Sequence, residues 1–193
     1  MASGSQKDPT TISVRGRGGR QIAIPSNMIT DKTRWVFQNG QCFSLAITIA
    51  EKLGSDVGLL VRAVRAPWGI RYNDPILNLP YDWFKCTLHA VALTNFGGMG
   101  AISVGIDGVV DLGSLRDEFI KTLPEYMSAT MIVAPPEWVR QRLVKSGSAS
   151  TGFLKPDYEA AEIVFNLMKL DSEFAPLLSN QPSYPSCLGS GLV

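Results

Sequence analysis

Cys42 is the residue best placed to carry out chemistry in this chain. It follows the turn sequence "NGQ" at the point where a helical pattern begins. A thiol at a helix N-terminus faces unpaired backbone N–H groups and the positive end of the helix dipole, and both favour the reactive thiolate. The same N–H groups can hold the oxyanion of an acyl-transfer intermediate. We therefore expect a nucleophile at Cys42, with a small buried apolar residue as the alternative.

A thiol nucleophile needs a base, and His89 is the single histidine of the chain. A third group must orient the imidazole. Asp111, in "VVDLG", lies on a later predicted strand, which we expect to neighbour the strand of His89 in the sheet. Asp107 is the other choice for this role, although its place in an Asp-Gly hairpin accounts for it without chemistry. The predicted catalytic set is Cys42, His89 and Asp111; the alternative is a structural histidine and an aspartate that accepts backbone hydrogen bonds.

Two further features would complete an active site. The backbone N–H of Cys42, helped by the side chain of Gln38 or Gln41, would stabilise the oxyanion. Residues 67–83 contain three prolines and form a connection longer than most loops without secondary structure. Long loops of this kind are often functional. We expect this loop to form one wall of a substrate cleft, with the aromatic residues Trp68, Tyr72, Tyr81 and Trp83.

The elements around these residues predict an α+β fold. Leu45, Ile49 and Leu53 recur with helical spacing after Cys42, and Gly54 fits the end of that helix. The stretches "VGLLVRAVRA", "LHAVALTN" and "AISVG" predict strands, and the Asp107-Gly108 dipeptide predicts a hairpin. The expected arrangement is an N-terminal nucleophile helix packed on a central antiparallel sheet, with C-terminal helices.

Three later helices are expected after the strands. The pattern Ser114-x-x-Asp117 predicts the start of one, and Pro136 and Pro156 are expected to open two more. The chain of 193 residues is long enough for one core. We expect a mobile basic arm over residues 1–20, a single α+β domain over 21–178 and an extended tail over 179–193.

The motifs at these positions resemble the transglutaminase-like superfamily, which includes the arylamine N-acetyltransferases. The resemblance rests on "NGQCFSLAITIAEKLGSDVGLLVRAV", "HAVAL" and "VVDLG", within residues 38–115. It implies a Cys42–His89–Asp111 triad and a helix packed on an antiparallel sheet. Papain-like proteases, including viral leader proteases, share the order of Cys then His. The expected activity is that of a cysteine hydrolase or acyltransferase, acting on a protein, a peptide or a small acyl substrate.

A structural class of function competes with this expectation. The Arg-Gly run "RGRGGR" is typical of segments that bind RNA, and it would use Arg15, Arg17 and Arg20. A short basic arm before a small domain also fits a viral coat or nucleocapsid protein without an active site. The net charge of +1 argues against binding of nucleic acid over the whole surface.

Composition narrows the remaining possibilities. With one histidine and no Cys-x-x-Cys motif, the sequence predicts neither a metal site nor a cofactor. Three cysteines cannot all pair with one another, so a disulfide scaffold is not expected. No apolar run is long enough to span a membrane, and no signal sequence is visible. These features predict a cytoplasmic protein, or one delivered without a signal peptide.

Overall fold

The computed structural model describes residues 10–16, 19–66, 69–71, 87–96, 99–125, 127–145, 155–170 and 174–175. Several residues singled out in the sequence lie outside this part of the chain. They are Arg17, the aromatic residues Trp68, Tyr72, Tyr81 and Trp83, and the tail 179–193.

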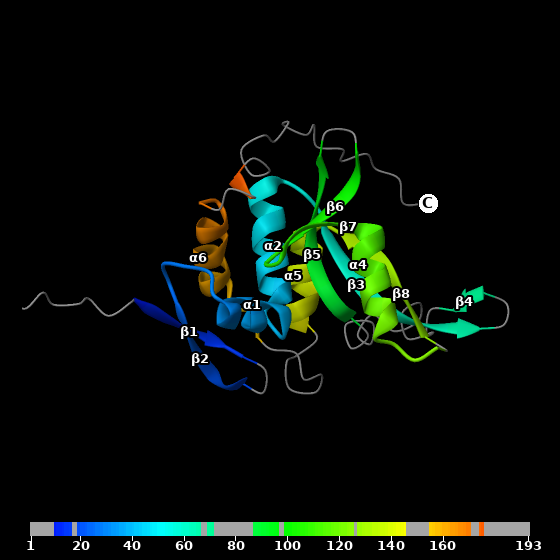
Figure 1. Ribbon diagram of the computed structural model, residues 1–193, viewed down its shortest axis with the longest axis horizontal. Coiled ribbons are helices and arrows are strands. Elements are labelled where there is room, and N and C mark those ends of the chain that lie inside the picture. The colour runs from blue at the N-terminus through cyan, green and yellow to red at the C-terminus, as the bar shows by residue number, and fades with distance from the viewer. Residues whose placement is uncertain are drawn as a thin grey trace, which may run out of the picture.

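A six-stranded antiparallel sheet forms the centre of the molecule (Figure 1). Its strands run in the order β4-β3-β5-β6-β7, and β8 pairs with β3. Their bounds are β3 Val57–Ala66, β4 Gly69–Arg71, β5 Thr87–Phe96, β6 Met99–Gly105, β7 Gly108–Asp111 and β8 Met127–Ala134. The predicted hairpin is confirmed, because Gly105 pairs with Gly108 around a two-residue turn.

Helix α2 (Cys42–Leu53) packs against one face of this sheet, as the sequence predicted. Its residues Ile47, Ile49 and Ala50 are fully buried, and across from them Ala90 and Ala92 of β5 belong to the same core. The opposite side of α2 contacts α5 (Pro136–Lys145) and α6 (Tyr158–Met168). Because it is covered on both sides, α2 is apolar around most of its circumference.

Helix α4 (Leu112–Lys121) covers the other face of the sheet. Leu115 of α4 forms a second, smaller core with Val91 and Leu93 of β5. Figure 1 shows β5 between α2 and α4. Alternate residues of β5 therefore enter different cores, with Ala90 and Ala92 facing α2 and Val91 and Leu93 facing α4.

The start of α4 differs from the predicted one at Ser114. Asp111 is the N-cap, and its Oδ1 accepts hydrogen bonds from the backbone N–H of Gly113 at 2.9 Å and of Ser114 at 3.1 Å. The short connection from β7 explains the difference, because the helix begins directly where the strand ends. The two later helices are confirmed: α5 opens at Pro136, and α6 follows Pro156 with Asp157 as its N-cap.

A separate hairpin and a short helix precede α2. Strands β1 (Thr11–Arg15) and β2 (Gln21–Pro25) pair antiparallel, and α1 (Asp31–Gln38) follows them. Val14 of β1 and Ile24 of β2 are fully buried in the main core. The part of residues 1–20 that forms β1 therefore belongs to the folded domain, whereas the sequence assigned it to the arm.

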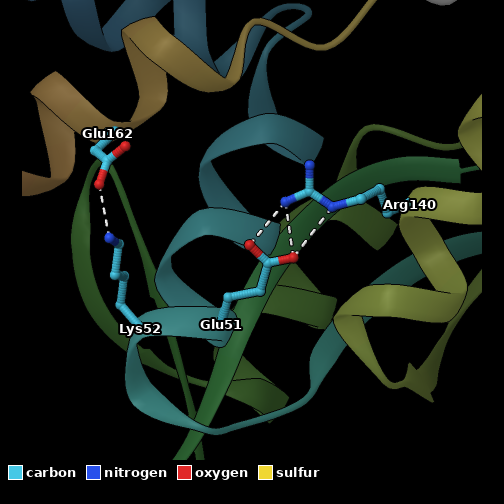
Figure 2. Close-up of polar contacts among 4 residues, drawn as sticks. All are labelled: Glu51, Lys52, Arg140 and Glu162. Carbon is cyan, nitrogen blue, oxygen red and sulfur yellow. Dashed lines mark hydrogen bonds and ion pairs between the residues drawn. The ribbon is translucent and has the colours of Figure 1, made fainter.

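Ion pairs tie the C-terminal end of α2 to the two helices beside it (Figure 2). Arg140 of α5 donates to both carboxylate oxygens of Glu51, each at 2.7 Å, and its guanidinium lies 3.9 Å from the ring centroid of Tyr158. Lys52 pairs with Glu162 of α6 at 2.6 Å. Among the residues that the structure describes, none of the helices is both long and apolar enough to cross a membrane.

Candidate functional site

Cys42 is the first residue of α2 and is half-buried. Burial raises the pKa of its thiol to about 11, and backbone hydrogen bonds with Ala90 and Phe43 lower it by less. The thiol is therefore protonated at neutral pH. The helix terminus that was expected to favour the thiolate is present, but desolvation outweighs it.

Cys42 and His89 border one small cavity. It lies between the end of α1, the start of α2 and the β5–β6 pair, and its volume is about 10 Å³. The remaining lining is apolar apart from the backbone: Phe37, Leu45, Ala46, Ala90, Val104, Gly105 and Ile106. A space of this size holds at most one water molecule, so an amide or ester substrate does not fit in the described arrangement.

The imidazole of His89 points away from the thiol. It stacks on the ring of Phe119 of α4, with the ring centroids 5.5 Å apart and an angle of 23° between the planes. This contact places the ring on the face of β5 that carries Val91 and Leu93, whereas Cys42 packs on the face of Ala90. The structure thus brings the two residues to one cavity but leaves their side chains on opposite faces of the strand.

Burial also governs the charge of the imidazole. It lowers the pKa of His89 to about 4, and the negative charge of Asp107 raises it by a smaller amount. The histidine is therefore neutral at pH 7. A neutral imidazole can accept a proton, which a general base must do, but its low basicity here makes it a weak one.

Of the two aspartates, Asp107 is the one that acts on His89. It lies in the β6–β7 turn, where its Oδ2 accepts from Nε2 of Gln38 at 2.6 Å and its Oδ1 lies 3.9 Å from Nη1 of Arg34. Asp111 is exposed, and hydrogen bonds from Ser114 lower the pKa of its carboxyl. Asp111 thus has the structural role that was the alternative to catalysis.

The side chain of Gln41 is fully committed to the fold. Its Nε2 donates to the backbone carbonyls of Arg15 at 2.8 Å and Lys155 at 3.3 Å. Its Oε1 accepts from the backbone N–H of Asp157 and from the Ser44 hydroxyl, both at 2.9 Å. Both N–H donors are used, so this arrangement leaves none of them for the oxyanion role suggested by the sequence. Gln38 is exposed and uses its amide on Asp107.

Of the predicted RNA-binding arginines, Arg15 and Arg20 lie at the β1–β2 hairpin, and Arg17 lies outside the described residues. Arg15 ends β1 and borders an open hollow of about 290 Å³ at the start of α6, next to Lys155 and Glu159. Arg20 is exposed just before β2. Both signs of charge line the hollow, so it does not form a purely basic surface. Within the described part of the chain, no group of acidic, histidine or cysteine side chains could hold a metal ion.

Sequence reasoning identified Cys42 and His89 but missed Phe119. Phe119 belongs to the helical stripe of α4, and a stripe of this kind indicates burial without indicating which strand residue lies beneath it. No protein-family model, no curated protein and no solved structure matches this chain. Its function is therefore argued from its own residues.

Proposed function

We propose that the chain is a cysteine-dependent hydrolase or acyltransferase, similar to a thiol protease, with Cys42 as its nucleophile. The observation that supports this most is the meeting of Cys42 and His89 at one cavity, where α2 begins and β5 passes. The charge of Asp107 acts on the same histidine. Acyl transfer through a thiol requires three groups: a nucleophile, a base, and a third group, here a carboxylate, that orients the base.

Each group has a defined role in the proposed reaction. The sulfur of Cys42 attacks the carbonyl carbon of an amide or ester, and His89 takes the thiol proton and later gives it to the leaving group. Asp107, held by Gln38 and Arg34, orients the imidazole in place of Asp111. The backbone N–H of Cys42 at the start of α2 faces the developing oxyanion.

The described arrangement corresponds to a resting form of such an enzyme. The thiol and the imidazole are both neutral, the imidazole lies against Phe119, and the cavity holds no more than a water molecule. Turnover therefore requires the imidazole to reach the α2 face of β5 and the cavity to open. Conformational gating of this kind is common in enzymes.

Alkylation of the native protein tests the proposal. Iodoacetamide labelling at a series of pH values, read by mass spectrometry, gives separate rates for Cys42, Cys86 and Cys187. Through the form in which His89 reaches the thiol, we expect Cys42 to react well below the pH at which an ordinary thiol ionises, about 8.5. In the described form alone, whose thiol has a pKa of about 11, it would react more slowly than an ordinary thiol. His89→Ala and Asp107→Asn should both slow the reaction.

Asp111→Asn is the matched control, because it removes a carboxylate of the same type that caps α4. It should leave the alkylation rate of Cys42 unchanged. If Cys42 stays unlabelled in the native protein, or reacts at a rate that does not depend on His89, then both are core residues. The chain would then be a binding or structural domain.

A further inference from the structure

An irregularity in β5 determines which face His89 presents. Strand β3 pairs with β8 in unbroken register from Val57 to Val64, so β3 itself is regular. Its pairing with β5 shifts between Leu60 and Val61. Leu60 lies opposite His89 and Val61 lies opposite Thr87, which leaves Leu88 as an extra residue on β5. Leu88 is therefore part of a β-bulge.

Residues opposite each other in an antiparallel pair point to the same face. Leu59 and Val61 of β3 pack in the core beneath α2, so Leu60 between them faces α4. His89 faces α4 because it lies opposite Leu60, and there it meets Phe119. The position of the bulge thus fixes the direction of the imidazole.

A shift of the bulge by one residue would reverse that direction. If Leu88 took the place opposite Leu60, His89 would become the extra residue, next to Ala90 and opposite Leu59. In a bulge the two adjacent residues share the face of the residue that they oppose, which here is the face of α2. The thiol of Cys42 already forms a hydrogen bond with the backbone of Ala90. The pairs Leu59–Ala90 and Val61–Thr87 are the same in both arrangements.

We propose that the β5 bulge is a switch that moves by one residue and carries His89 from its stack on Phe119 to the cavity of Cys42. This inference rests on the proposed function and names how that site is turned on. The stacked form separates the base from the thiol, and the shifted form brings them to one face. Bulges are over-represented beside active sites, where they redirect side chains.

Deletion of Leu88 tests the switch directly. The deletion removes the extra residue, retains every observed pair between β3 and β5, and so holds His89 opposite Leu60. Iodoacetamide labelling of Cys42 should fall to the rate of His89→Ala, a loss of about tenfold or more if the imidazole acts as a general base. Leu88→Ala is the matched control, because it retains the number of residues in β5 and should keep the wild-type rate. A deletion variant that labels as fast as wild type, and still depends on His89, would overturn the switch.

Phe119→Leu provides a second measurement that does not change the length of β5. It removes the ring that holds the imidazole and retains an apolar side chain on α4, so Cys42 should label faster than in wild type. If the deletion variant does not fold, judged by circular dichroism and cooperative unfolding, this variant decides, and an unchanged rate refutes the switch. If the proposed function itself is wrong, the result is different: Cys42 of the wild-type protein labels at a rate that does not depend on His89. In that case the switch is wrong as well.

Discussion

Among the individual residues, Gln41 connects more parts of the chain than any catalytic candidate. It is fully buried, and its amide joins Arg15 of β1 to Lys155 and Asp157 before α6. Such an amide suits this place because it offers two donors and an acceptor in one plane. Gln41 precedes the candidate nucleophile directly, yet its side chain serves the fold and not the proposed reaction.

Replacing Gln41 by Ala should therefore destabilise the fold strongly. The backbone groups of Arg15, Lys155 and Asp157 would lose their partner at partly buried positions. We expect a loss of roughly 2–4 kcal/mol in the free energy of unfolding. Gln38→Ala is the control, because the same side chain there is exposed and should cost less than about 1 kcal/mol. Urea denaturation measures both. Equal losses for the two variants would mean that the amide clamp does not hold the fold together.

The lowered pKa of His89 predicts a pH dependence of stability. The unfolded histidine takes up a proton near pH 6.5, whereas the folded one does so near pH 4. The unfolded state thus binds more protons between these values, and stability present above pH 6.5 is lost as the pH falls towards 4. Over the whole interval the loss through this group is roughly 3 kcal/mol.

Denaturation curves at pH 7 and pH 5 measure this effect in wild type and in His89→Phe, which retains a ring for Phe119. The variant should lose less stability than wild type between the two pH values. If both proteins lose the same amount, the histidine titrates alike in the folded and unfolded states. The imidazole would then not be held in the buried stack.

Among the elements, helix α2 has a candidate nucleophile at its N-terminus and a glycine cap at its C-terminus. Its N-terminus presents Cys42, and its C-terminus closes at Gly54, which adopts φ 61° and ψ 35°. The N–H of Ser55 bonds back to the carbonyl of Ala50 at 2.9 Å and completes the helix end. A residue with a Cβ is strained in this left-handed conformation, so glycine is needed here.

Gly54→Ala should therefore destabilise the protein by roughly 1–2 kcal/mol. Nothing lies within 4 Å of an added Cβ at this position, so the loss comes from the backbone conformation alone. Gly54→Asn should cost less, because asparagine tolerates the left-handed region better than alanine does. Thermal unfolding of the two variants measures the difference, and an alanine variant as stable as the asparagine variant would argue against this explanation.

Much of this element order was predictable, because the signals were local. Helix α2, strand β3, the β5–β6–β7 meander and helices α5 and α6 follow from periodicity and turn residues, and the structure confirms them. The sequence interpretation gave no strand for β8 and no helix for α1. β8 owes its place to pairing with β3, which is distant in the chain, and no local pattern records such a partner.

The candidate site was predictable in position but not in direction. The helix after "NGQ" and the strand of His89 follow from sequence, and they do meet at one cavity. The face on which His89 lies depends on the bulge at Leu88. That bulge is defined by the pairing of β5 with β3, which the sequence of β5 alone does not reveal. The role of Asp111 was ambiguous because a cap and a catalytic acid both need a carboxylate at the end of a strand.

For the molecule as a whole, the N-terminal hairpin belongs to the core, so removing residues 1–20 also removes part of the folded domain. Val14 is fully buried, and the carbonyl of Arg15 accepts from Gln41. Deleting residues 1–20 would remove both, so we expect a large loss of stability, at least the roughly 1.5–3 kcal/mol that burial of a valine contributes. A deletion of residues 2–9 leaves every described contact in place and should unfold like wild type. Thermal unfolding of the two truncated proteins measures this, and similar melting temperatures would show that β1 contributes little to the core.

The RNA-binding alternative therefore needs charge substitutions that preserve the hairpin. In Arg15→Gln, Arg17→Gln and Arg20→Gln combined, three positive charges disappear while β1 and the Arg15 carbonyl remain. If these arginines bind RNA, the slope of log K against log salt in wild type should be about −2 to −3, and the triple variant should lose that binding. Under the proposed function we expect the triple variant to label at Cys42 as fast as wild type. Gel filtration with and without RNA completes the test. Large regular assemblies that require the three arginines, together with a rate of Cys42 labelling that is independent of His89, would assign the chain to an RNA-packaging role.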